Sequence, residues 1–142
     1  MLEEKRLTTE VRNIAKDFLK EIENKPLQVI SHFDTDGITS AAIITKALRR
    51  LDKSFDLRIV KNLTKEIIQE LPKNKVTLFL DLASGSLEEI KNSEIEKVFI
   101  VDHHEVQKEI PSNIRIVNPE LWDKEKISGS GMTYLFCREI DE

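Results

Sequence analysis

Five short, mainly apolar segments alternate with helical patterns along this chain of 142 residues, and this alternation is the feature that most constrains the fold. The apolar segments span residues 27–33, 55–60, 76–82, 98–102 and 114–118. Short strands that are apolar almost throughout are typical of a parallel sheet covered by helices on both faces, because neither face then meets water. The pattern therefore predicts an α/β fold.

The segments around these strands carry apolar residues at helical spacing and residues that favour helix starts. A first helix is expected over residues 1–24, where its apolar stripe either covers the sheet or docks a partner; the stripe is Val11, Ile14, Ala15, Phe18, Leu19 and Ile22. Gly37 and Thr39 are expected to lead into a second helix that ends near residue 51, with an inward side made of Ile38, Ala41, Ala42, Leu48 and Leu51. Thr64 and Ser86 are expected to cap short helices, and a last helix to begin near Gly131. We expect residues 1–26 to form an N-terminal helix and residues 27–142 to form one domain.

Composition and charge exclude several classes of protein. The formal net charge of −4 and the pI of about 5.5 argue against binding of nucleic acid through bulk positive charge, but leave room for a local basic groove or a bound metal. The single cysteine, Cys137, excludes an internal disulfide and fits a reducing compartment, so we expect a cytoplasmic protein. Apolar runs stay well short of the roughly 20 residues of a membrane span, and the charged N-terminus does not read as a signal peptide, so we expect no membrane association.

Polar side chains with ligand chemistry lie at the ends of four of these segments. They are His32, Asp34 and Asp36 after the first, Asp81 at the third, Asp102, His103 and His104 at the fourth, and Asn118 at the fifth. Ligands bind outside the carboxyl ends of parallel strands, so these side chains should share one edge of the sheet. Taken singly, each group has a plainer explanation, since aspartates cap helices and histidines occur in solvated turns.

Several carboxylates and imidazoles at one edge suit a pair of divalent metal ions, and such oxygen-rich ligands favour Mn²⁺ or Mg²⁺ over a zinc–thiolate site. A site of this kind activates water and neutralises charge on a phosphoryl group. Nothing in the sequence resembles a serine or cysteine nucleophile motif, which favours direct attack by water. Ser128, Gly129, Ser130 and Gly131 precede the last helix, where free N–H groups and hydroxyls could hold a phosphate or simply start the helix.

These segments resemble the motifs of the DHH phosphoesterase superfamily. The run His32–Gly37 looks like the first motif, Asp81 like the second, Asp102-His103-His104 like the third, and Asn118-Pro119 with residues 128–131 like the loop before the fourth. Within the superfamily, residues 31–43 and 128–139 look closest to archaeal RecJ-like nucleases, including those associated with GINS. The resemblance implies a three-layer, Rossmann-like domain with a mainly parallel five-stranded sheet and helices on both faces.

The resemblance also implies a role for each residue. Asp34 and Asp36 would each hold one of two Mn²⁺ ions, with Mg²⁺ as a substitute, and Asp81 would bridge them. His103 would be a further ligand, and His32 another, although its place two residues before Asp34 differs from the spacing of other branches. His104 would contact the scissile phosphate and Asp102 would buttress the histidines, which makes these two the catalytic pair.

The implied activity is Mn²⁺-dependent hydrolysis of phosphodiesters, typically by an exonuclease acting on single-stranded DNA or RNA in replication and repair. Two alternatives are a DHH enzyme acting on pyrophosphate, oligoribonucleotides or cyclic dinucleotides, and a replisome scaffold that binds GINS or the replicative helicase. The family's fourth motif and its small C-terminal substrate-binding domain would follow Glu142. We therefore expect a fragment of a longer protein, weak or inactive by itself.

Overall fold

The computed structural model describes residues 2–106, 109–121 and 126–141, with side chains from residue 6 onward. Its strands are β1 (Leu27–His32), β2 (Asp56–Val60), β3 (Val76–Leu80), β4 (Lys97–Val101) and β5 (Ile114–Val117). Its helices are α1 (Leu2–Ile22), α2 (Thr35–Arg50), α3 (Lys65–Glu70), α4 (Leu87–Asn92) and α5 (Gly129–Ile140), with a 3₁₀ turn, η1, at Pro119–Leu121. The expected alternation of strands and helices is therefore present.

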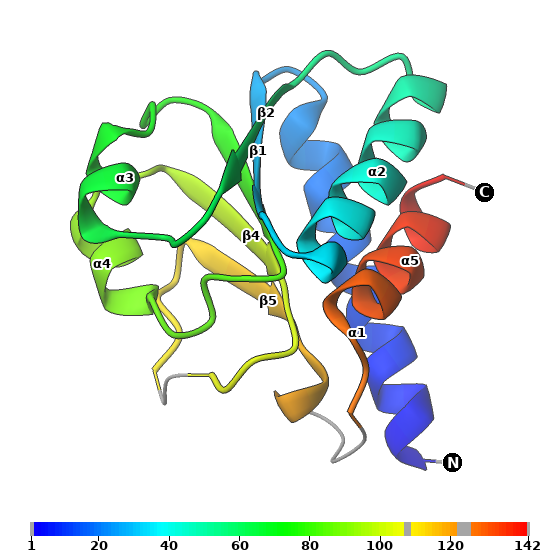
Figure 1. The fold of residues 1–142 in the computed structure, drawn as a ribbon. Coiled ribbons are helices and arrows are strands. Elements are labelled where there is room, and N and C mark those ends of the chain that lie inside the picture. Colours follow the sequence, from blue (N-terminus) through cyan, green and yellow to red (C-terminus); the bar gives the residue numbers. More distant parts are fainter. Residues whose placement is uncertain (1, 107–108, 122–125, 142) are drawn as a thin grey trace.

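All strand pairs are parallel, and the strands lie in the order β2-β1-β3-β4-β5. The chain runs outward from β1 to β2 and then returns to the other side of β1 to form β3. This reversal creates a switch point between β1 and β3, and in open parallel sheets of this order ligands bind beyond the strand ends at that point. Figure 1 shows α1, α2 and α5 on one face of the sheet and α3 and α4 on the other.

Two hydrophobic clusters occupy the two faces, which explains why the inner strands β1, β3 and β4 are mainly apolar. On the α1 side, Phe18 packs edge-on against Phe99 of β4 and Phe136 of α5, with ring centroids 5.3 Å apart in both pairs. Buried aromatic rings contribute more to stability than any other side chains of the core. The apolar stripe of α1 is thus buried within the cluster that covers the sheet.

The boundaries differ from the expected ones in ways that concern the candidate site. β3 and β4 end at Leu80 and Val101, so Asp81 and Asp102 follow their strands instead of ending them. Helix α2 begins at Thr35, before the expected lead-in at Gly37 and Thr39, and α5 begins at Gly129, two residues before its expected start. Asp36 consequently lies in the first turn of α2, directly after the turn that follows β1.

The expected inward side of α2 is partly wrong. Ala41 and Leu48 are buried, but Ile38 and Leu51 are 48% and 37% exposed and Ala42 is exposed as well. Ile44 and Ala47 take their places in the core. The helix starts earlier than expected, and a pattern rich in apolar residues on several sides leaves the rotation of a helix open.

In the part of the chain that the structure describes, no helix has the length and apolar character needed to cross a membrane. The division of the chain at residues 26 and 27 remains a prediction.

Candidate metal centre

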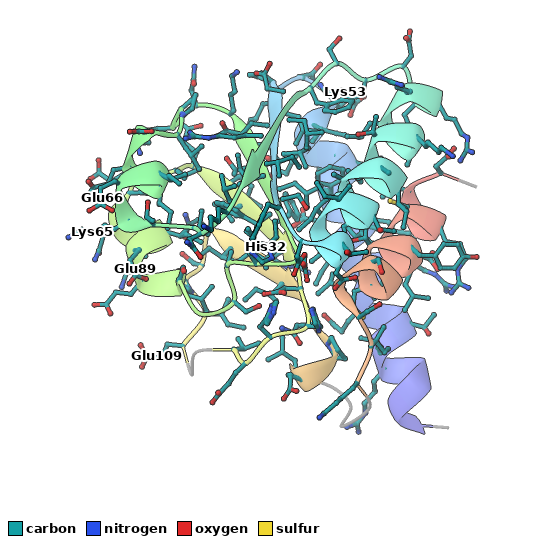
Figure 2. The ribbon with its side chains drawn as sticks, in the orientation of Figure 1. His32, Lys53, Lys65, Glu66, Glu89 and Glu109 are labelled. Carbon is teal, nitrogen blue, oxygen red and sulfur yellow. The ribbon has the colours of Figure 1, made fainter. Side chains whose placement is uncertain are left out.

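The turn after β1 brings the first group of predicted residues together beside the end of β3. His32 Nδ1 lies 3.0 Å from Asp34 Oδ2 and 3.6 Å from Asp81 Oδ2. Asp34 is the N-cap of α2, and its Oδ1 accepts a hydrogen bond from the Gly37 N–H at 2.8 Å. One oxygen of Asp34 therefore caps the helix while the other faces His32, and the role of Asp34 as a metal ligand stays a prediction. Figure 2 shows His32 where β1 leads into α2.

The hydrogen bond that His32 makes decides which of its two ring nitrogens carries the proton. Its Nε2 lies 3.0 Å from the carbonyl oxygen of Lys61, which can only accept, so Nε2 carries a proton. In the neutral imidazole, Nδ1 is then a lone pair that faces two carboxylate oxygens. Both His32 Nδ1 and Asp81 Oδ2 are buried without a hydrogen-bond partner. We name His32 Nδ1, Asp34 Oδ2 and Asp81 Oδ2 the first acceptor set.

The other oxygen of Asp81 faces a second group. Asp81 Oδ1 lies 2.9 Å from His103 Nε2, and the same nitrogen lies 3.4 Å from Asp36 Oδ2. We name Asp36 Oδ2, Asp81 Oδ1 and His103 Nε2 the second acceptor set, because all three can accept a cation once the proton of the hydrogen bond between His103 and Asp81 is lost. Asp81 is 1% exposed and adopts a positive φ of 61°, a conformation that aspartate and asparagine tolerate better than most residues. The strand end thus turns one buried carboxylate toward both sets.

Electrostatics distinguishes the three carboxylates. Burial, together with the nearby carboxylates of Asp36 and Asp34, raises the pKa of Asp81 to about 8. The hydrogen bond from Gly37 is the main reason that the pKa of Asp34 is lowered. Burial alone would raise the pKa of Asp36, but hydrogen bonds from Ser130 and Gly129 outweigh it and lower the pKa. When a buried acid lies beside two ionised carboxylates, their mutual repulsion opposes its ionisation, and a bound cation would offset that repulsion.

Residues 128–131 hold Asp36. Asp36 Oδ2 accepts the Gly129 N–H at 2.7 Å and Asp36 Oδ1 accepts the Ser130 N–H at 2.8 Å. The Gly131 N–H donates to the Ser128 hydroxyl at 3.0 Å. The N–H groups of residues 129 and 130 are thus used by a carboxylate of the chain itself. A phosphate role for this loop stays a prediction that rests on the hydroxyls of Ser128 and Ser130.

Close packing at Gly129 explains why this loop needs glycine. A Cβ atom at position 129 would lie 2.3 Å from Asp81 Oδ1 and 2.7 Å from Asp36 Oδ2, well inside van der Waals contact. The absence of a side chain lets the start of α5 lie directly against the two carboxylates. The first turn of α5 is therefore part of the wall of the site.

Asp102 and His104 lie next to the acceptor sets and contact each other. Asp102 is fully buried, and its Oδ1 lies 2.6 Å from His104 Nδ1 and accepts the His103 N–H at 2.8 Å. Its Oδ2 accepts the N–H of Ser84 at 3.2 Å. The His104 side chain is 55% exposed, and its ring lies 4.3 Å from that of His103, centroid to centroid. Asp102 thus orients a histidine that remains open to solvent.

The residues present fit a divalent cation. In the first acceptor set, the His32 lone pair and two carboxylate oxygens converge, and His32, Asp34 and Asp81 each offer an atom within 4.8 Å of the others. Asp81, Asp102, His103 and His104 form a further group by the same measure. Oxygen and imidazole donors in this proportion suit Mn²⁺ or Mg²⁺.

The comparison with known families decides the ancestry of the chain. Residues 26–142 match the model of the DHH family, N-terminal domain. The chain belongs to the DHH family.

Two relatives extend this DHH assignment. The uncharacterized protein MJ0831 of Methanocaldococcus jannaschii is 35% identical over 92% of this chain, which corresponds to 33% of the relative. The protein YorK of Bacillus subtilis, which carries the name of a prophage-derived single-strand DNA-specific exonuclease, is 27% identical over 77% of this chain and 20% of its own length. The DHH chain therefore spans between a fifth and a third of these relatives.

Solved structures show the same fold. A crystal structure of the exonuclease RecJ bound to manganese matches 92% of this chain and 37% of its own, with a TM-score of 0.78 and 23% identity. RecJ from Thermus thermophilus in complex with Mn²⁺ matches 92% of this chain and 20% of its own, with a TM-score of 0.75 and 25% identity. CDC45 from Entamoeba histolytica matches 96% of this chain and 29% of its own, with a TM-score of 0.62 and 18% identity. The expected α/β architecture is confirmed.

Three residues of this DHH site lie outside the predicted set of ligands and catalytic groups. Lys61 holds His32 through its carbonyl oxygen, a contact without any side-chain signature in the sequence. Ser84 binds Asp102 through its N–H and accepts a hydrogen bond from Asn118 at 3.1 Å. The same amide group of buried Asn118 donates to the carbonyl oxygen of His104 at 2.8 Å. Only Asn118 had a signal, namely its place at the end of the fifth strand.

Proposed function

We propose that this chain carries the metal centre of a RecJ-like phosphoesterase that hydrolyses phosphodiester bonds in single-stranded nucleic acid. The family and the fold support hydrolase chemistry at this edge of the sheet. The name of YorK supports single-stranded DNA as the substrate class, and the manganese-bound RecJ structures support Mn²⁺ as the cation. Since the chain spans only part of each relative, the activity and partners of the whole protein belong to this proposal.

The position of Asp81 is the observation that carries the proposal. Its two oxygens face different acceptor sets, which is the arrangement that a carboxylate shared by two ions requires. In this assignment His32, Asp34 and Asp81 hold one ion, and Asp36, Asp81 and His103 hold the other. Divalent ions held there would supply activated water and would neutralise the charge of the phosphoryl group.

Beside the ions, the chain itself would supply a hydrogen-bond donor to the substrate, namely His104. Asp102 accepts the proton on His104 Nδ1, so the Nε2 of the exposed ring is the atom left to meet a substrate. When protonated, this nitrogen donates to a non-bridging phosphate oxygen and stabilises the charge that develops there. Asn118 fixes the backbone of His104, and Ser84 fixes Asp102, so the donor is positioned before substrate arrives.

Finer features remain part of the proposal. They are the number of bound ions, the choice between Mn²⁺ and Mg²⁺, the choice between DNA and RNA, and a partnership with GINS at the replicative helicase. The likeness to CDC45 concerns the fold alone. The alternative substrates are pyrophosphate, oligoribonucleotides and cyclic dinucleotides, and they are tested beside single-stranded oligonucleotides.

A metal count tests the proposal directly. The chain is dialysed against Mn²⁺ and the bound ions are counted by native mass spectrometry and by atomic absorption. Asp81→Asn is the test variant, and Lys91→Gln, at an exposed position of α4, is the control. We expect one or two ions in the wild-type chain and in the control, and a loss of at least one in Asp81→Asn. Equal counts in all three chains would contradict the assignment of Asp81.

A further inference from the structure

Strand β2 is an open edge of the sheet. It pairs with β1 alone among the described residues, and four of its five residues are exposed. At the other edge, three of the four residues of β5 are buried and the strand contacts α1. An open edge presents unpaired N–H and C=O groups, which form a template for one more strand.

The side chains of this edge alternate between apolar and charged. Leu57 and Ile59, 42% and 39% exposed, lie in register with Val29 and Ser31, which places them on the face covered by α2. Phe55, just before the strand, packs partly buried against the cluster of that face. Asp56 and Arg58 point to the opposite face, where Lys75 pairs with Asp56 and Glu70 lies 3.7 Å from Arg58.

We propose that the occupant of this edge is the β2 strand of a second copy of the chain, paired antiparallel around a two-fold axis at Leu57. In this register Leu57 faces its own equivalent, and Phe55 faces Ile59 on either side. Asp56 of each copy then faces Arg58 of the other on the opposite side of the sheet. Directly opposed apolar pairs and opposite charges are the contacts that stabilise antiparallel strands. Two five-stranded sheets would thereby join into one continuous sheet.

Charge complementarity selects this register. Side chains along a strand alternate between the two faces of the sheet. In a two-fold antiparallel pair, the equivalent faces of the two copies lie on the same side, so one residue of the strand must face its own equivalent across the axis. An axis at Arg58 would set two arginines opposite each other, and an axis at Asp56 would do the same with two aspartates. The axis at Leu57 instead gives a row of alternating sign, Lys75, Asp56, then Arg58 and Glu70 of the second copy. The closed two-fold arrangement also prevents growth into a fibre.

Charge reversal at the two positions provides the test. The existing side chains of Asp56 and Arg58 are 73% and 47% exposed, so a reversal at either position leaves the core intact. Arg58→Asp places two aspartates opposite each other across the interface, and Asp56→Arg places two arginines there. In a one-to-one mixture of these two variants, every opposed pair has opposite charge again. Lys91→Asp, on the outer side of α4, has the same change of charge as Arg58→Asp and is the control.

Sedimentation velocity of the wild-type chain from about 10 μM to about 1 mM should show a weak, reversible dimer, as expected for a small interface. Each reversal variant alone should associate at least tenfold more weakly, the mixture should recover heterodimers, and Lys91→Asp should behave as the wild type. Amide exchange over residues 55–59 should slow as the concentration rises. A wild-type chain that stays monomeric up to 1 mM, or a dimer that both reversals leave intact, would overturn the proposal. Metal binding lies at other residues, so this result is independent of the metal count.

Discussion

Asp102 Oδ1 and His104 Nδ1 lie 2.6 Å apart, and this contact joins a fully buried aspartate to the most exposed of the three histidines. The carboxylate accepts the Nδ1 proton and thereby selects one tautomer of the ring. His104 Nε2 is left to face solvent. A residue that merely formed a solvated turn would not need a buried acid with three N–H donors around it.

Replacing His104 by alanine should lower the rate of Mn²⁺-dependent hydrolysis by about 10²-fold or more, because a positioned donor to the phosphate is lost. The ring is half exposed, so the midpoint of thermal unfolding should change little. Mn²⁺ binding should also persist, since His104 belongs to neither acceptor set. Because the chain is expected to be weakly active by itself, the rate is measured as single-turnover cleavage of a labelled single-stranded oligonucleotide with the chain in excess. A measurable rate that the variant leaves unchanged would remove His104 from the proposed machinery.

Replacing Asp102 by asparagine should reduce both activity and stability. Every oxygen of Asp102 accepts at least one N–H, so either orientation of the asparagine amide sets an NH₂ group against a donor. Leaving a buried donor unpaired costs about 1–3 kcal/mol. Urea unfolding of Asp102→Asn beside His104→Ala measures this difference. If both variants are as stable as the wild type, the hydrogen-bond network around Asp102 is not formed as described.

Asp34 offers a variant that separates capping from metal binding. Asparagine caps helices as well as aspartate does, so Asp34→Asn should keep the stability of the metal-free chain, whereas Asp34→Ala should lose about 1 kcal/mol. Both should bind Mn²⁺ at least tenfold more weakly than the wild type, because the charged Oδ2 of the first acceptor set is gone. Isothermal titration with Mn²⁺ and thermal unfolding with a chelator measure the two effects. Tight binding by Asp34→Asn would exclude Asp34 as a ligand.

The sequence predicts the fold and the edge that carries the site, because both depend on regular patterns. Continuous apolar strands and interleaved helices indicate a covered parallel sheet, and polar residues after the strands indicate its carboxyl edge. The motif residues His32, Asp34, Asp81 and His103 indeed converge there. Their chemical roles stay predictions, since position alone does not show which atoms bind a metal.

Three features could not be predicted because they depend on atoms without a residue-specific signature. The carbonyl oxygen that orients His32 belongs to Lys61, and any residue would offer the same atom. The N–H groups of residues 129 and 130 bind Asp36 instead of a phosphate, a choice set by how α5 meets α2. The rotation of α2, which exposes Ile38, follows from the same packing.

Two glycines provide a matched test of the packing at the start of α5. Gly129→Ala should destabilise the chain by about 1–3 kcal/mol, as overpacking does, because its Cβ would lie 2.3 Å from Asp81 Oδ1. It should also weaken Mn²⁺ binding, since both acceptor sets include Asp81. Gly85→Ala is the control, because a Cβ there would meet nothing within 4 Å. Chemical unfolding measures the stability of both variants, and titration measures their affinity for Mn²⁺. Equal stability and equal affinity in the two variants would mean that α5 does not contact the carboxylates.

Asp81 gives the clearest dependence on pH. Its pKa is raised to about 8 in the folded chain, against 3.8 as the ordinary value, so between these values the metal-free folded state holds a proton that the unfolded state has lost. The contribution of Asp81 to stability therefore falls as the pH rises from about 4 to about 8.

The variant Asp81→Asn removes this penalty and keeps a residue suited to the positive φ. In the presence of a chelator, the variant should therefore be more stable than the wild type, and the difference should be larger at pH 8 than at pH 6. With Mn²⁺ the order should reverse, because only the wild type gains the stabilisation that a bound ligand provides. Thermal unfolding of both chains at the two pH values, with chelator and with Mn²⁺, measures all four differences; a variant that Mn²⁺ stabilises as strongly as the wild type would exclude Asp81 from the metal centre.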